Sequence, residues 1–209
     1  ETKKGIDYAH LDLKDFNLQA QKIDYNNENI SGNINAFTVK EKSGLNVQEL
    51  KTNFFYGKKE AYLKNLYLKT PNTLLKNKVI VKYESVANIS KDLENLLIEA
   101  DLNNSKIAFQ DILIVAPQLA NTNPFKSNPT AVLYVNTNLS GKLKDLNIAY
   151  FQMSGIGNTR VDVSGKIIGL PDMKKAFFDL DIKNLESTSK DVLSFVPPKT
   201  IPTNIQLPA

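Results

Sequence analysis

The alternation of apolar and polar residues with a period of two is the feature that most constrains how this chain folds. Residues 79–83 read Val-Ile-Val-Lys-Tyr, and residues 178–182 read Phe-Asp-Leu-Asp-Ile. Such alternation indicates strands with one buried and one solvated face. Clusters rich in Gly, Asn, Ser and Lys interrupt these runs and predict turns at 26–29, 42–44, 57–60 and 155–158. The sequence therefore predicts an all-β protein made of meandering antiparallel strands.

A short pattern that occurs three times, at residues 13–18, 63–68 and 143–148, places a Lys-Asp or Lys-Asn pair between apolar residues. The apolar residues that flank this pair lie three positions apart. In a regular strand they would point to opposite faces, because strand side chains alternate strictly. We therefore predict a bulge or a bend at Lys14-Asp15, Lys64-Asn65 and Lys144-Asp145.

A second pattern, Ser-Gly-x-Ile/Leu, occurs at residues 31–34, 140–143 and 164–167. A glycine inside a strand marks a bend or a close approach of another backbone. The pattern predicts such features at these three glycines.

A longer repeat relates two parts of the second half of the chain. Asp111-Ile112-Leu113 and Pro117 recur 80 residues later as Asp191-Val192-Leu193 and Pro197. We predict short helices at 111–116 and 191–196, each stopped by its proline. The same offset aligns 97–103 with a clearly alternating segment, so we predict a strand there, preceded at most by a helical turn. We divide the chain into residues 1–89 and residues 90–209, which contain the repeat, within one continuous architecture.

The residues capable of chemistry are few. The chain has no Cys and one His, and His10 lies in an alternating run that begins at Ile6, which predicts a half-buried strand histidine. Asp179 and Asp181 share one strand face, and we interpret that face as solvated. No nucleophile, metal-ligand or phosphate-loop motif occurs. We expect no enzyme activity, no metal and no cofactor.

The charge of the chain is weakly basic, with a formal net charge of +4, and the lysines are scattered. Arg160 is the only arginine, and arginine is the usual reader of guanine. We therefore expect no nucleic-acid partner.

The surplus of apolar strand residues is the remaining signal. Little helix is available to cover the face that they form, so the sheet must close on itself as a sandwich or leave an apolar trough for a ligand. The residues alone leave both outcomes open. The candidate residues of this face are Leu11, Leu13, Phe16, Leu18, Ile34, Phe37, Val39, Phe54, Leu63, Leu66, Leu68, Val79, Val81, Tyr134, Leu143, Leu146, Ile148, Val161, Val163, Phe178, Leu180 and Ile182.

The order of these motifs resembles the AsmA-like proteins of the TamB group, especially Bacteroidetes members. The Leu-Lys-Asp/Asn and Ser-Gly patterns are similar to theirs. So are residues 5–83, with Glu41-Lys42-Ser43-Gly44-Leu45 and Leu68-Lys69-Thr70-Pro71-Asn72, and Gly169-Leu170-Pro171-Asp172 followed by the 189–193 repeat. The resemblance covers most of the chain and marks it as an internal segment of a longer protein.

The resemblance implies a β-taco, a long folded sheet with an apolar groove, in the periplasm. It implies an inner-membrane anchor elsewhere in the longer protein. Two functions follow from it as expectations. One is transfer of phospholipid between the inner and outer membranes, with the acyl chains in the groove. The other is a scaffold for assembly or secretion of β-rich proteins with a BamA-like outer-membrane barrel partner, which would bind outside this segment.

Overall fold

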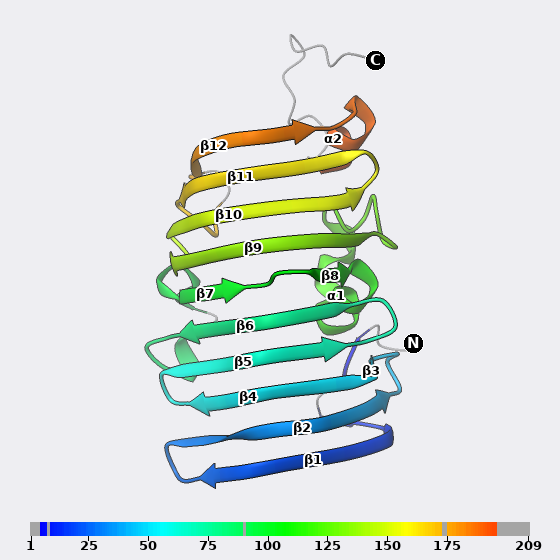
Figure 1. Cartoon of the computed structure of the whole chain (residues 1–209), viewed down its shortest axis with the longest axis vertical. Helices are drawn as coiled ribbons and strands as arrows, with labels where there is room; N and C mark the ends of the chain where they lie inside the picture. Colours follow the sequence, from blue (N-terminus) through cyan, green and yellow to red (C-terminus); the bar gives the residue numbers. More distant parts are fainter. Residues whose placement is uncertain (1–4, 8, 90, 173–174, 196–209) are drawn as a thin grey trace.

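One large antiparallel sheet forms the molecule, shown in Figure 1. The computed structural model describes residues 5–7, 9–89, 91–172 and 175–195. The strands in these ranges are β1 (Leu13–Tyr25), β2 (Asn29–Glu41), β3 (Asn46–Val47), β4 (Glu49–Gly57), β5 (Glu60–Lys69), β6 (Leu74–Lys82), β7 (Leu97–Asp101), β8 (Ser105–Ala108), β9 (Val132–Lys142), β10 (Asp145–Ile156), β11 (Thr159–Ile168) and β12 (Phe177–Glu186). Their main order is β1-β2-β4-β5-β6-β7-β9-β10-β11-β12. The predicted all-β fold with a curved antiparallel sheet is confirmed.

The helices are short and lie at the margins of the sheet. In the described residues they are α1 (Phe109–Val115), α2 (Ser189–Phe195) and the 3₁₀ helices η1 (Val86–Asn88), η2 (Leu93–Asn95) and η3 (Pro117–Asn121). The two predicted helices are present. The first α-helix ends before Pro117, which opens η3, while Val196 and Pro197 lie outside the described residues. The strand predicted at 97–103 is β7, and η2 precedes it.

Bulges occur at two of the three predicted sites. The pairing of β1 with β2 shifts register between Lys14 and Asn17, and the pairing of β5 with β6 shifts between Lys64 and Leu66. The extra residues, Asp15 and Asn65, have φ angles of 52° and 51°. Asn and Asp tolerate this left-handed region better than other non-glycine residues. The bulges keep the flanking apolar residues on one face, Leu13 with Phe16 in β1 and Leu63 with Leu66 in β5.

The third site has a different structure. Strand β9 ends at Lys142 and β10 begins at Asp145, so the Lys144-Asp145 pair closes a hairpin turn. The backbone N–H groups of Leu143 and Lys144 donate to the carbonyls of Leu96 and Glu94. The chain turns a corner here between strands, whereas it bulges within a strand at the other two sites.

Buried threonines donate hydrogen bonds to carbonyl groups beside two bulges. Thr52 Oγ1 donates to the carbonyl of Lys64 at 3.0 Å, beside the β5 bulge. Thr137 Oγ1 donates to the carbonyl of Tyr150 at 3.1 Å, beside a register shift in β10. Both threonine side chains are buried. The bulges therefore cost few hydrogen bonds, and the strands can bend at them.

Replacing Thr137 by Val should lower the free energy of unfolding by about 0.5–1.5 kcal/mol, because the near-isosteric change removes the hydroxyl that donates to the Tyr150 carbonyl. Thr38→Val is the matched control, since Thr38 Oγ1 makes a similar bond to Asp15 at an exposed position. Denaturant unfolding of both variants measures the difference. Equal losses in the two variants would contradict the role assigned to Thr137.

Close backbone contacts explain two of the three Ser-Gly patterns. Gly141 and Gly165 have φ angles of 122° and 130°, and a Cβ atom at either position would meet a backbone carbonyl oxygen of the neighbouring chain segment. Gly32 has no such φ angle, and its crowding comes from the side chain of Ile23. The predicted close approach is therefore strongest at Gly141 and Gly165.

The 80-residue repeat has a structural counterpart in how each helix is anchored. Asp111, in the first turn of α1, accepts a hydrogen bond of 2.6 Å from the Thr70 hydroxyl in the β5–β6 turn. Asp191, in the first turn of α2, accepts one of 3.0 Å from the Asn158 N–H in the β10–β11 turn. Each aspartate thus ties its helix to a hairpin turn of the sheet.

The attachment of α2 should weaken in acid. The Asn158 N–H and the Thr188 hydroxyl hold the pKa of Asp191 below its ordinary value, because both hydrogen bonds favour the carboxylate. The stabilisation from this attachment is therefore fully present at pH values above the ordinary pKa of an aspartate. It is lost as the pH falls through the lowered pKa of Asp191. We expect the Asn158 amide proton resonance to titrate with a midpoint below that of an ordinary aspartate. A midpoint at or above that value, or unchanged titration in Asp191→Asn, would contradict this.

The predicted strand at His10 is wrong. Strand β1 begins only at Leu13, and His10 lies in a turn. Its side chain is exposed, and its Nδ1 atom is 3.4 Å from Asp7 Oδ2. Tyr8, which belonged to the alternating run, lies outside the described residues. A local Asp-His contact, which alternation cannot reveal, replaces the strand.

Candidate functional site

The sheet has an apolar face and a polar face. In β6, Val79 and Val81 lie on the apolar face, whereas Lys78 and Lys82 lie on the polar face. Residues paired across antiparallel strands point to the same side, so the register carries this division from strand to strand. Nineteen of the predicted residues fall on the apolar face: Leu13, Phe16, Leu18, Ile34, Phe37, Val39, Phe54, Leu63, Leu66, Leu68, Val79, Val81, Leu146, Ile148, Val161, Val163, Phe178, Leu180 and Ile182.

Three predicted residues lie elsewhere. Leu11 precedes β1 and is exposed, and Leu143 lies in the β9–β10 turn. Tyr134 is on the polar face, because it pairs with Ser154, which in turn pairs with Arg160. The prediction for Tyr134 placed it in the wrong register: the alternation of β9 puts Val135 on the apolar face, where it is buried.

Sequence reasoning missed several members of the apolar face. They are Leu50, Tyr56, Ile98, Leu139, Phe151 and Met153. The hairpin register would have revealed some of them, since Phe151 pairs with Val163 and Met153 with Val161. When the position of the turn is unknown, the pairing can be wrong by one residue. A shift of one residue moves every side chain of the strand to the other face.

Charged side chains are excluded from the apolar face over most of the sheet. Every Lys, Arg, Asp and Glu of strands β4 to β11 pairs onto the polar face. The apolar face of these strands otherwise carries aliphatic, aromatic, Met, Thr, Ser and Gly residues, and Asn77, which pairs with Leu66, turns its amide to Asp101 on the polar face. Ten strands at a spacing of about 4.8 Å give this face a length of roughly 43 Å from β1 to β12.

The apolar face is most exposed in its two edge strands, whereas Val39 in β2 and Val163 in β11, next to those edges, are buried at 6% and 7% exposed. Leu66 and Ile148 are buried at 4% and 7% exposed, while Phe16 in β1 and Phe178 in β12 are 56% and 47% exposed. The described residues pair no further strand with the outer edges of β1 and β12. The apolar face thus runs to both edges of the sheet without a polar border.

A hollow of about 550 Å³ lies at the end of the sheet where β1 turns into β2 and β4 turns into β5. Tyr25, Ile30, Tyr56 and Val86 supply its apolar walls. The buried Tyr83 hydroxyl donates to the Gly57 carbonyl at 2.7 Å and holds the β4–β5 turn beside it; burial raises the pKa of this phenol. At the opposite end of the strands lies α1 (Figure 1). The rest of the hollow's lining is polar turn residues, among them Asn26, Glu28 and Lys58, so the hollow is part apolar and part polar.

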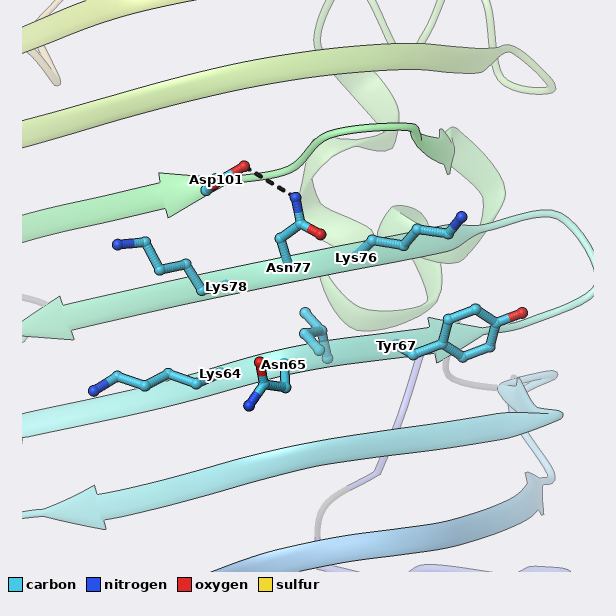
Figure 2. A pocket seen from close by; sticks show the side chains of 8 residues that line it. Lys64, Asn65, Tyr67, Lys76, Asn77, Lys78 and Asp101 are labelled. Carbon is cyan, nitrogen blue, oxygen red and sulfur yellow. Dashed lines mark hydrogen bonds between the residues drawn. The ribbon is translucent and has the colours of Figure 1, made fainter.

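The polar face has its own hollow, of about 700 Å³, shown in Figure 2. It is lined by Lys64, Asn65, Leu66, Tyr67, Lys76, Asn77, Lys78 and Asp101. The β5 bulge lies at its floor, and Asn77, with φ 80°, lies in the facing strand. Asn77 Nδ2 donates to Asp101 Oδ1 at 3.1 Å across to β7.

The residues considered for chemistry are dispersed. Asp179 and Asp181 are exposed on the polar face of β12, far along the sheet from His10 in the turn before β1. In the part of the chain that the structure describes, no three His, Asp or Glu residues are grouped so that they could hold a metal ion. Nor does any helix there have the length and apolar character required to cross a membrane.

Comparison with known proteins gives no match: no family model fits the chain, and neither curated proteins nor solved structures show significant similarity to it.

Proposed function

We propose that this chain is a lipid-transfer segment whose apolar face holds the acyl chains of phospholipids. The single observation that carries the proposal is the apolar face itself, which excludes charged residues from β4 to β11 and runs to both edges of the sheet. Its edge strands leave large apolar side chains exposed, among them Phe16 in β1 and Phe178 in β12, and clustered exposed apolar side chains commonly mark a binding surface.

The chemistry of the face suits acyl chains. Each methylene of an acyl chain that moves from water onto the apolar face contributes about 0.8 kcal/mol of binding free energy. An acyl chain of ordinary length would therefore be held without polar contacts. The open wall at Tyr25 and Tyr56 offers a place where a chain could enter. At the edge strands β1 and β12, an acyl chain could pass from the apolar face onto a neighbouring apolar surface.

The resemblance to AsmA-like proteins of the TamB group extends this proposal to a cellular setting. On that basis we propose a periplasmic segment of a longer, inner-membrane-anchored protein. It would pass phospholipid between the inner and outer membranes, as a protein without enzyme activity. The headgroup would remain in water, because the face has no charged groups from β4 to β11 to receive it.

A second candidate function is a scaffold for the assembly of β-rich proteins with a BamA-like partner. The open edges of β1 and β12 favour it, since an unpaired strand can add a strand from another protein. Two bulges in β1 count against pairing there, because bulges commonly protect an edge. Strand β12 has a single register shift and is the better edge.

Extraction of lipid from the purified protein tests the proposal. We expect mass spectrometry of the organic extract to find phospholipid in a reproducible molar ratio to protein. Addition of lipid to delipidated protein should restore that ratio. A chain that carries no lipid after purification and takes up none from vesicles would refute the lipid-transfer function and leave the scaffold.

A further inference from the structure

The polar face of β5 and β6 concentrates positive charge at the middle of the sheet. Five lysines lie there, together with one carboxylate, that of Glu60: Lys64 and Lys69 from β5, and Lys76, Lys78 and Lys82 from β6. Among the described residues Glu60 pairs with Lys82, whose Nζ atom is 3.9 Å from Oε1. The remaining lysines of the two strands therefore face water with little compensation from their own strands.

Two of these lysines are placed against each other. Lys64 and Lys78 are directly paired across β5 and β6, which brings like charges together and costs stability. Lys78 Nζ is 3.4 Å from Glu99, whereas Lys64 Nζ lies 4.2 Å from the centre of the Tyr62 ring and contacts no carboxylate. Lys76 forms no ion pair within the described ranges. An unfavourable arrangement of this kind is relieved when an anion binds between the charges.

The side chains of three of these lysines line the hollow on the polar face. Figure 2 shows Lys64 and Lys78 on one side of it and Lys76 with Tyr67 on the other, with Asn65 and Asn77 between them. The lining contains three lysines and one carboxylate. A volume of about 700 Å³ accommodates a small polyanion.

The one carboxylate of the lining is already engaged by neutral donors. Asp101 Oδ1 accepts hydrogen bonds from Asn77 Nδ2 at 3.1 Å and from Asn103 Nδ2 at 2.6 Å. These bonds hold Asp101 at the β7 side of the hollow. It does not form an ion pair with Lys64 or Lys76.

We infer that this hollow binds an anionic ligand that carries phosphate groups, through Lys64, Lys76 and Lys78. The Tyr67 hydroxyl is available as an additional hydrogen-bond donor. Because the hollow lies on the opposite side of the sheet from the apolar face, it does not receive the headgroup of a lipid whose chains lie on that face. The site is therefore independent of the proposed function, and either can fail alone.

Titration calorimetry with tripolyphosphate tests the site. We expect saturable binding that weakens as salt is raised, and at least tenfold weaker binding in the double variant Lys64→Gln/Lys78→Gln. The control is Lys142→Gln/Lys166→Gln, which removes the same charge from the polar face of β9 and β11 and should change affinity less than twofold. Thermal unfolding checks that both variants fold. Absence of saturable binding, or equal loss in both double variants, overturns the inference.

Vesicle flotation then identifies the source of the phosphate. If the ligand is a membrane headgroup, the parent protein should bind phosphatidylglycerol vesicles more strongly than phosphatidylcholine vesicles, and the Lys64/Lys78 variant should lose that difference. If the ligand is a soluble phosphate compound, tripolyphosphate binding persists without any preference for anionic vesicles. A preference that the variant retains would place anion recognition elsewhere and contradict the inference.

Discussion

A glutamate in place of Val81 is expected to abolish lipid binding in a chain that still folds. Val81 lies on the apolar face of β6, where it pairs with Ala61 and Ile98, and it is only partly buried. A carboxylate there can reach water, so the sheet tolerates it. Acyl chains would instead have to bury the charge or leave the face, and burial of an unpaired charge is costly. Lipid extraction and thermal unfolding of Val81→Glu measure the two effects separately.

Two control variants show whether an effect of Val81→Glu comes from loss of the fold or from the position of the charge. Leu66→Glu should unfold the chain, since Leu66 is 4% exposed and burial of an unpaired carboxylate is costly. Asn147→Glu adds the same side chain to the polar face of β10 and should change neither folding nor lipid binding. If Val81→Glu unfolds the chain as Leu66→Glu does, the apolar face is a sealed core. If it keeps both fold and lipid, the acyl chains lie elsewhere.

Gly165→Ala should be among the most damaging single methyl additions in the sheet, at about 2–6 kcal/mol. This sum combines backbone strain of about 1–3 kcal/mol with overpacking of a similar size. Gly165 has φ 130°, and a Cβ atom there would collide with the backbone carbonyl of Asp179 in β12. The methyl group would push β12 away from β11. Denaturant unfolding and hydrogen exchange of the β12 amides should both report the change.

The Gly44→Ala variant distinguishes the effect of a steric collision of the added Cβ atom from the effect of backbone strain. Gly44 also has a positive φ angle, of 103°, but a Cβ atom there would meet only the Ile114 side chain at an ordinary 3.7 Å. We expect it to lose about 1–3 kcal/mol from strain alone. If the two alanine variants lose the same stability, the close approach of β11 and β12 at Gly165 is not what requires glycine.

The strands and two bulges could be predicted from the sequence because both are local. Alternation is written in consecutive residues, and a three-residue spacing between leucines allows few solutions when both must face one way. At Lys144 the same local spacing is satisfied by a hairpin turn. The spacing indicates that the chain changes direction at this pair. It does not specify whether the change occurs as a bulge within a strand or as a turn between strands.

The parts that could not be predicted depend on contacts between distant residues. Tyr134 and Val135 are both apolar enough for a buried face, and only pairing with β10 decides which one is inside. The lysine-lined hollow requires Lys64 and Lys78, from neighbouring strands, to be in register. The 80-residue repeat indicated that Asp111 and Asp191 are equivalent, but their hairpin partners, Thr70 and Asn158, share no motif.

Photo-crosslinking with a phospholipid that carries a diazirine near the end of one acyl chain tests the central claim most directly. After irradiation and proteolysis, mass spectrometry locates the labelled residues. The lipid-transfer account predicts labels on apolar-face residues of β4 to β6, such as Phe54, Leu63 and Val81, and their loss in Val81→Glu. Labels confined to the polar face, or no labels on the parent chain, would contradict it.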